Sequence, residues 1–189
     1  ELETRADKYE DALGTYIMKI STKNLKKEDS EMLNVMLHCI GDFERISDYA
    51  CNLCDSAREL QQKNMQFSPK AETELDILSS AVREAVDISF DAFKSNNKNE
   101  ADKVEPLEEL IDTLAVELKA RHIRRLREGK CTIELGFAHS DILNNLERVA
   151  DHCSNIAVDV IQSEQLEFDA HEYLDGIKNK DNQQFARDY

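Results

Sequence analysis

The stretch NLERVADHCSNIAVD, at residues 145–159, decides the organisation of this chain, because a similar stretch, DFERISDYACNLCD, already occurs at residues 42–55. When Glu44 is aligned with Glu147, arginine, aspartate and asparagine also coincide in the pattern E-R-x-x-D-x-x-x-N, and the apolar residues between them stay in step. A period of about 100 residues is too long for a solenoid, whose repeats have about 20 to 50 residues. The pattern therefore indicates a duplicated small domain.

The composition predicts that each copy is a bundle of helices. The 189 residues include only two prolines and five glycines, and good helix formers fill long segments without interruption. We therefore expect an all-α protein made of two tandem three-helix units, 1–96 and 97–189, which meet at a polar segment, NNKN. Apolar periodicity predicts helices over 2–20, 30–64, 69–95, 101–128 and 134–164, and a shorter sixth helix through Tyr173, Leu174 and Ile177.

Local signals mark several of the predicted helix ends. Asp29 or Ser30 is suited to cap the start of the second helix, and Ser68 followed by Pro69 is typical of an N-cap with proline in the first helical position. Gly129 is placed to end the fourth helix in the left-handed conformation.

Net charge and cysteine content narrow the classes of partner. The chain carries 39 acidic and 24 basic residues, a net charge of −15, which disfavours nucleic acid and favours cations. The chain has five cysteines, an odd number, and we expect them to be reduced thiols rather than a framework of disulfides. Cys51 and Cys54 lack the second Cys pair that a zinc site needs, and we expect them to be small buried residues. No apolar run approaches the roughly 20 residues of a membrane span.

Pairs of acidic residues four positions apart occur in both copies. Residues at that spacing share one face of a helix, so each pair directs two carboxylates the same way. If the two helices of a unit are antiparallel neighbours, their four carboxylates converge. The eight residues are Asp7, Asp11, Glu44 and Asp48 in the first copy and Glu108, Asp112, Glu147 and Asp151 in the second.

Such clusters need neutralisation, because two like charges about 5 Å apart repel by roughly 3 kcal/mol at an effective dielectric constant of 20. Protonation, arginine or bound cations could supply it. Carboxylates suit magnesium, manganese, calcium or iron, and a histidine would extend the choice to zinc. Spaced acids on helices are also common as solvated faces. Recurrence in both copies favours the metal-site interpretation.

Other residues of the repeat have two open roles. Arg45 and Arg148 follow a motif glutamate, where they either brace a carboxylate or cross-link helices. Asn52 and Asn155 either orient a ligand or cap a buried contact. His152, beside Asp151, is the strongest additional ligand candidate. The one basic stretch, KARHIRRLREGK at residues 119–130, is placed either as a solvated helix end or as a contact for anionic lipid or a partner.

The strings HCIGDFERISDYACNLCDSA, LKARHIRRLREGKCTIELGF and NNLERVADHCSNIA resemble the PhoU family over essentially the whole chain. Within it they are most similar to the cytoplasmic PhoU-like region that follows the membrane domain of bacterial sodium/phosphate cotransporters. The resemblance implies multinuclear iron or zinc clusters held by the eight acids, and regulation of phosphate uptake without catalysis. It also implies a membrane transport domain as partner, in the same polypeptide, and a location at the cytoplasmic side of the membrane.

Three alternatives differ in function from a cotransporter domain. One is a free-standing PhoU regulator of an ATP-driven phosphate importer, and another is a helical interaction module without metal. The third, a ferritin-like di-iron enzyme, needs Glu-x-x-His pairs, and none occurs. The identity and number of the metal ions, direct binding of phosphate and formation of a homodimer all stay open at this point.

Overall fold

The computed structural model describes residues 2–164, whose regular secondary structure is entirely helical. The helices are α1 (Leu2–Ser21), α2 (Lys27–Gln62), α3 (Pro69–Ser95), α4 (Lys98–Ala101), α5 (Val104–Arg127) and α6 (Ile133–Glu164). The predicted all-α class is confirmed. The expected helix through Tyr173 lies outside the described residues. Within residues 2–164, no helix combines the length and the hydropathy needed to cross a bilayer.

Local chemistry sets most of the helix ends as predicted. Ser68 has extended backbone and its Oγ accepts a hydrogen bond from the Ala71 N–H (3.3 Å), with Pro69 as the first helical residue. Gly129, just after α5, has a φ of +68°, in the left-handed region where glycine carries no steric penalty. Asn96 adopts the same region, with a φ of +47°, and ends α3.

The start of α2 differs from the prediction. The helix begins at Lys27, and Lys26 before it makes no side-chain capping bond. The Ser30 hydroxyl lies inside the first turn and donates to the Lys26 carbonyl (3.2 Å) instead of capping the helix. The assignment of Asp29 or Ser30 as N-cap was therefore wrong. Lysine and glutamate have high helix propensity, which explains why the helix extends to an earlier residue.

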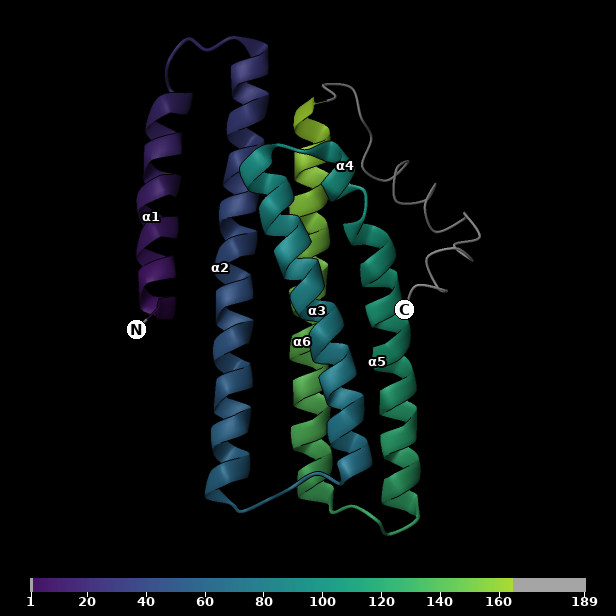
Figure 1. Ribbon diagram of the computed structural model, residues 1–189. Coiled ribbons are helices and arrows are strands. Elements are labelled where there is room, and N and C mark those ends of the chain that lie inside the picture. Colours follow the sequence, from purple (N-terminus) through teal and green to yellow (C-terminus); the bar gives the residue numbers. More distant parts are fainter. Residues whose placement is uncertain (1, 165–189) are drawn as a thin grey trace.

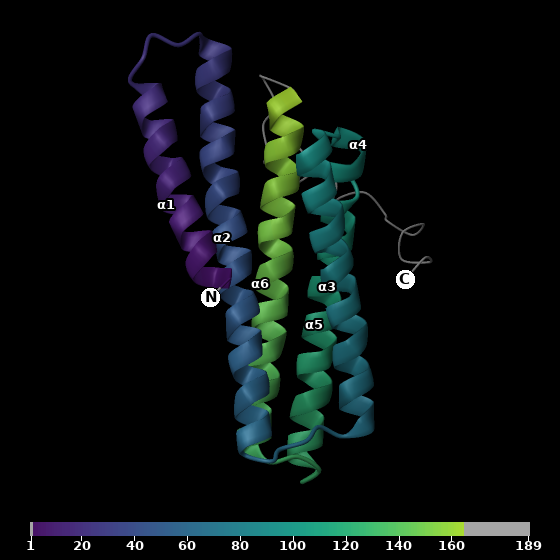
Figure 2. The ribbon, with the colours of Figure 1, turned by 60° about the vertical axis from the view of Figure 1, so that its left-hand side comes forward.

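Helix α6 is the centre of the arrangement (Figures 1 and 2). It packs against α2 on one side and against α3 and α5 on the other, while α1 packs on the outer side of α2. Helix α3 lies mainly against α5 and α6, although Phe43 of α2 reaches the rings of Phe90 and Phe93. The division of the chain into units 1–96 and 97–189 stays a prediction, since the second unit extends beyond the described residues.

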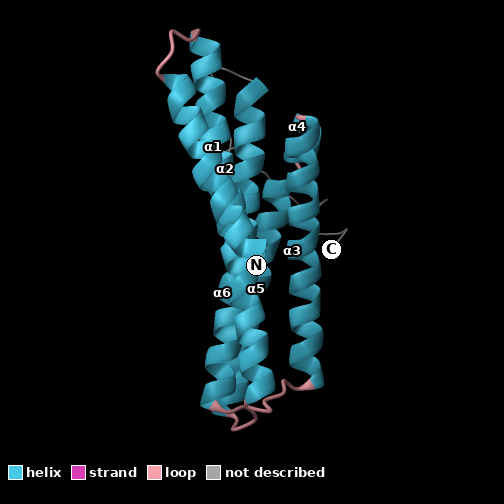
Figure 3. Cartoon of the chain, turned by 90° about the vertical axis from the view of Figure 1, so that its left-hand side faces the viewer, coloured by secondary structure: helices cyan, strands magenta, loops and turns pink. Residues whose placement is uncertain are grey.

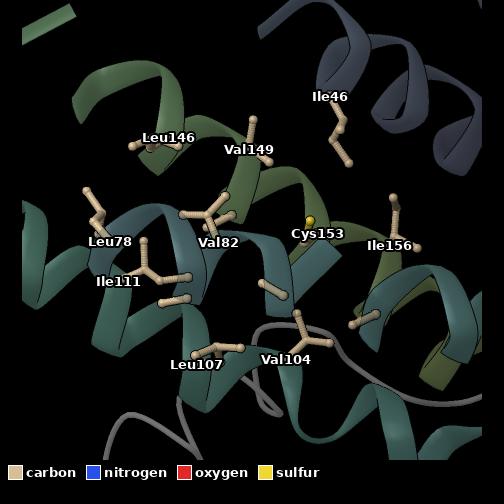
Figure 4. Close-up of a cluster of buried hydrophobic side chains, with 14 of the residues drawn as sticks. Ile46, Leu78, Val82, Val104, Leu107, Ile111, Leu146, Val149, Cys153 and Ile156 are labelled. Carbon is tan, nitrogen blue, oxygen red and sulfur yellow. The ribbon is translucent and has the colours of Figure 1, made fainter. Parts of the chain in front are cut away.

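The hydrophobic core lies where α3, α5 and α6 meet, and Ile46 contributes to it from α2 (Figure 4). Its largest fully buried apolar side chains are Leu78, Leu107, Ile111, Leu143, Ile156 and Ile161. The α1–α2 pair buries much less, and only Ile17 of α1 is buried.

The two cysteines near the middle of α2 contradict a prediction. All five cysteines have free thiols, as expected, but Cys51 and Cys54 are exposed rather than buried. The prediction rested on the usual burial of free cysteines, which behave as small apolar residues. The packing of α3 on α5 and α6 leaves the face of α2 that carries both cysteines open to solvent.

The interface between α2 and α6 has internal symmetry. Asn52 Nδ2 donates to Asn145 Oδ1 (3.4 Å), and Asn155 Nδ2 donates to Asp42 Oδ1 (3.2 Å). In the alignment of the two copies, Asn52 corresponds to Asn155 and Asp42 to Asn145. Each hydrogen bond is therefore the counterpart of the other, and the two antiparallel helices are related by a pseudo-twofold axis.

Substitution of Ile111 by alanine tests the position of the core. The side chain is fully buried in the core (Figure 4), so Ile111→Ala should lower the free energy of unfolding by about 2 to 5 kcal/mol through lost contacts and a residual cavity. Urea denaturation measures this change. Val116→Ala, at a site on α5 that is 64% exposed, should change the same quantity by about 0.5 kcal/mol or less. Equal losses in both variants would contradict the assignment of Ile111 to the core.

Candidate metal sites

The α5–α6 acidic cluster consists of Glu108 and Asp112 on α5 and Glu147 and Asp151 on α6. Glu108, Asp112 and Asp151 each offer a carboxylate oxygen, and these three atoms lie within 4.8 Å of one another. Glu147 is part of the same charge cluster, but its Oε2 accepts a hydrogen bond from Lys119 Nζ (2.6 Å). The structure thus brings together the four acids predicted from the second copy, and three of them could share one ion.

Burial and mutual repulsion both act on these carboxyl groups. Burial, followed by the charge of Asp112, raises the pKa of Glu108 to about 8. Burial, followed by the charges of Glu147 and Asp151, raises the pKa of Asp112 to about 6. The pKa of Asp151 is raised by burial and by Glu147. The negative charge of the four carboxylates is therefore not balanced by their surroundings, although Lys119 lies beside them.

One oxygen of this cluster has no partner. Asp112 Oδ1 is buried and makes no hydrogen bond to any described residue. A buried carboxylate oxygen without a donor is costly, and a cation at that oxygen would satisfy it. The residues present therefore fit a bound metal ion.

Two further acids next to the cluster were missed at the sequence level. Oxygens of Glu105, Glu108 and Glu109 also lie within 4.8 Å of one another. Glu105 is only 4% exposed and accepts a hydrogen bond from the Ser154 hydroxyl. Its place three residues before Glu108, on the same side of α5, was the available signal.

The α1–α2 acidic cluster consists of Glu3, Asp7 and Glu10 on α1 and Glu44 and Asp48 on α2. Carboxylate oxygens of Glu3, Asp7 and Asp48 lie within 4.8 Å of one another, and Asp7 Oδ1 is buried without a partner among the described residues. The pKa of Glu44 is raised by burial first and then by Asp48 and Glu10, against the opposing charge of Arg45. This second cluster repeats the features of the first.

Asp11 is the one predicted ligand that the structure leaves outside. It is exposed on α1 and joins no group of three close acids in the described part of the chain. The less exposed residues of α1 lie at 3, 6, 7, 10, 14, 17 and 20, and position 11 is not among them. That spacing selects Glu3 and Glu10 instead, and neither was predicted.

The two arginines of the repeat have different roles. Arg45 Nε lies 3.5 Å from Glu44 Oε2, and its Nη1 lies 3.5 Å from Asp48 Oδ2, so Arg45 braces the α1–α2 acidic cluster. Arg148 Nη1 donates to the Tyr49 hydroxyl (3.0 Å), and its guanidinium lies over the Tyr49 ring. Arg148 therefore cross-links α6 to α2.

His152 and the two motif asparagines also serve the α2–α6 interface. His152 Nδ1 lies 2.7 Å from Asp42 Oδ1, and its ring stacks on Tyr49 with 5.6 Å between centroids. Asn155 shares Asp42, and Asn52 bonds to α6. Asp42 and Tyr49 were not singled out in the sequence, although each stands close to the repeated motif.

Comparison with known proteins gives the family. The sequence profile described as PhoU domain matches residues 1–57 and 75–160, well over half of the chain. The chain belongs to the PhoU family. Its curated relatives include the phosphate-specific transport system accessory protein PhoU homolog 1 of Thermotoga maritima, 28% identical over 138 residues, covering 73% of this chain and 58% of the relative. The PhoU homolog of Synechocystis sp. is 24% identical over 131 residues, covering 69% of this chain and 56% of that protein.

The chain spans less than two thirds of the length of these two PhoU relatives.

Solved PhoU structures share its fold. The phosphate transport system regulatory protein of Streptococcus pneumoniae matches with a TM-score of 0.76 at 18% identity, covering 87% of this chain and 76% of that one. PhoU of Pseudomonas aeruginosa matches with a TM-score of 0.70 at 22% identity, covering 87% and 81%. The predicted family and fold are confirmed, whereas these relatives give no support to the cotransporter branch.

The raised pKa of Glu108 predicts the pH dependence of stability in metal-free protein. The pKa is about 8 in the folded state against a reference value of 4.5, so the folded state keeps a proton that the unfolded chain releases. The stabilisation is complete below pH 4.5 and is lost as the pH rises through 8. With solvent screening taken into account, Glu108→Gln should raise the free energy of unfolding at pH 8 by roughly 1 to 3 kcal/mol.

Urea denaturation at pH 5 and pH 8, in the presence of a chelator, measures this effect. The matched control is Glu84→Gln, which removes the same charge from an exposed position on α3. If wild type and Glu108→Gln lost stability in parallel between the two pH values, the predicted cause of the pH dependence would be wrong.

Proposed function

We propose that this protein is a PhoU-type regulator of phosphate transport, in which metal ions at the α1–α2 and α5–α6 acidic clusters fix the packing of the helices. The observation that carries the proposal is the recurrence of an acidic cluster between the paired helices of each copy. Each cluster has a buried oxygen that finds no partner in the described part of the chain, on Asp7 in one and Asp112 in the other. Random surface acids would not repeat this arrangement.

The donor sets favour cations that prefer oxygen. Glu108, Asp112 and Asp151 would hold an ion in the second copy, and Glu3, Asp7 and Asp48 in the first. All of these donors are carboxylates, which suits iron, manganese, magnesium or calcium, and zinc accepts carboxylates as well. The ion would supply positive charge that joins two helices, and we assign no catalytic step to it.

A transporter is the partner that this function requires. Both curated relatives are named as accessory proteins of a phosphate-specific transport system. We therefore favour a regulator that acts on a phosphate transporter at the cytoplasmic side of the membrane over a domain of a sodium-coupled cotransporter. In our proposal, metal occupancy sets the relative position of α5 and α6, and this position determines how the protein contacts its transporter.

Metal content is the first test. The variant Asp112→Asn/Asp151→Asn removes two donors and two charges from the α5–α6 acidic cluster, so the purified protein should lose the metal of that cluster. Elemental analysis of protein purified without chelator measures the content. The control Glu84→Gln/Asp87→Asn changes two exposed acids of α3 and should keep the wild-type content.

Added metal should also stabilise the wild-type protein, by about 2.7 kcal/mol at a concentration 100-fold above Kd. The variant Asp112→Asn/Asp151→Asn should lose the part of this stabilisation that comes from metal bound at the α5–α6 acidic cluster. Wild-type protein with no metal and no stabilisation would favour the metal-free interaction module, in which Lys119 and Arg45 provide the neutralisation.

Phosphate uptake in cells tests the regulatory role. A strain that lacks this protein should keep a high rate of labelled phosphate uptake in phosphate-rich medium, and the wild-type protein should restore the low rate. The variant Asp112→Asn/Asp151→Asn should fail to restore it, because its helices are no longer fixed by the ion, whereas Glu84→Gln/Asp87→Asn should succeed. Unchanged uptake after deletion would refute regulation, and full restoration by the cluster variant would refute the role of the metal.

A further inference from the structure

A basic cleft is lined by residues at the start of α3 and at the end of α5. The α2–α3 and α5–α6 loops run at this end of the bundle (Figures 1 and 3). The cleft has a volume of about 350 Å³. It is formed by the first turn of α3, the last turns of α5 and the segment after α5. Five basic side chains line it: Lys70, Arg121, Arg124, Arg125 and Lys130. In a chain with a net charge of −15, this concentration of positive charge is an exception that needs an explanation.

Carboxylates neutralise only part of the cleft. Buried Glu74 accepts hydrogen bonds from Arg125 (2.7 Å) and Arg121 (3.2 Å), and Arg121 also pairs with Glu117 (2.8 Å). Glu128 pairs with Lys130 (2.7 Å). Within residues 2–164, five cations thus meet three carboxylates, and two positive charges remain.

The remaining charges belong to Lys70 and Arg124. Both side chains are exposed, and neither forms an ion pair within the described part of the chain. Arg125 lies beside them, where its Nη1 is held by buried Glu74, so a third cationic side chain lines the cleft without adding a free charge.

The helix dipole explains only some of these positions. Arg124 and Arg125 lie in the last turn of α5, where positive charge is favourable. Lys70 lies in the first turn of α3, where the dipole disfavours positive charge and favours an anion. The convergence of Lys70 with the arginines of α5 therefore indicates a ligand rather than helix stabilisation.

We propose that this cleft binds a phosphate group, carried by a small molecule or a lipid headgroup. An arginine fork matches the oxygens of phosphate, and exposed Arg124 provides one. Ser68 also lines the cleft, and its hydroxyl hydrogen can be donated to the ligand while its oxygen continues to cap α3. The volume is at the lower end of small-molecule sites, about 300 to 1,000 Å³, and admits more than the phosphate group alone.

The basic cleft is separate from the proposed metal sites. Arg125 stands thirteen positions after Asp112 on α5, a distance of about 20 Å along the helix at 1.5 Å per residue. A ligand of the cleft therefore makes no contact with the α5–α6 acidic cluster, and the inference does not depend on the proposed function.

Calorimetric titration of the full chain, in chelator and at low salt, tests the site with inorganic phosphate and with glycerol 3-phosphate. Cosedimentation with phosphatidylglycerol vesicles, compared with phosphatidylcholine vesicles, tests the lipid source. The variant Lys70→Gln/Arg124→Gln should weaken binding roughly tenfold or more, because it removes the two unpaired charges without breaking an ion pair. Glu128→Gln, which removes a carboxylate from the cleft, should strengthen binding.

The matched control is Lys23→Gln/Arg83→Gln, which removes two exposed cations away from the cleft and should leave binding unchanged. Circular dichroism of each variant confirms that it is folded. Binding of either soluble phosphate, lost in the cleft variant, supports a free ligand, whereas binding of phosphatidylglycerol vesicles alone, lost in the same variant, supports a headgroup. No binding in any titration, or binding that survives in the cleft variant or extends to phosphatidylcholine, overturns the proposal.

Discussion

The position of α6 between three neighbouring helices is the constraint on which the structure depends. With 100° between successive residues, Glu147 and Asp151 face α5, whereas Arg148, His152 and Asn155 lie about a quarter turn further round and face α2. The opposite side of the helix carries the apolar residues that enter the core. The repeated motif therefore serves two helix contacts at once, and its spacing is set by both.

This division places the carboxylates at the edge of the core instead of in open solvent. The same burial that stabilises Val149 and Ile156 raises the pKa values of Glu108, Asp112 and Asp151. Stability and charge are thus coupled, because close packing of α5 on α6 also brings the acids together. A positive ion between these helices would relieve this repulsion without loosening the core.

Local features of the sequence predicted much of the fold. Ser68 with Pro69, and Gly129, mark helix ends through interactions within a few residues, and the five long helices of residues 2–164 follow the apolar periodicity. The short α4 was not predicted, because its four residues lie partly in the polar segment NNKN and carry no periodicity. The α5–α6 acidic cluster could also be predicted, because the acids four residues apart on α5 and α6 meet. Glu3 and Glu10, rather than Asp11, belong to the α1–α2 acidic cluster because of the way α1 crosses α2. The exposure of Cys51 depends on where α3 packs, and neither contact is encoded locally.

The paired hydrogen bonds between α2 and α6 give the two halves of one polypeptide the geometry of a homodimer. When two identical subunits associate about a twofold axis, every contact across the axis occurs twice. Here that doubling occurs within one chain, as Asn52 with Asn145 and Asn155 with Asp42. A homodimer must place the same residue at both equivalent positions. A single chain need not, and the stacked pair at equivalent positions is tyrosine on one side and histidine on the other.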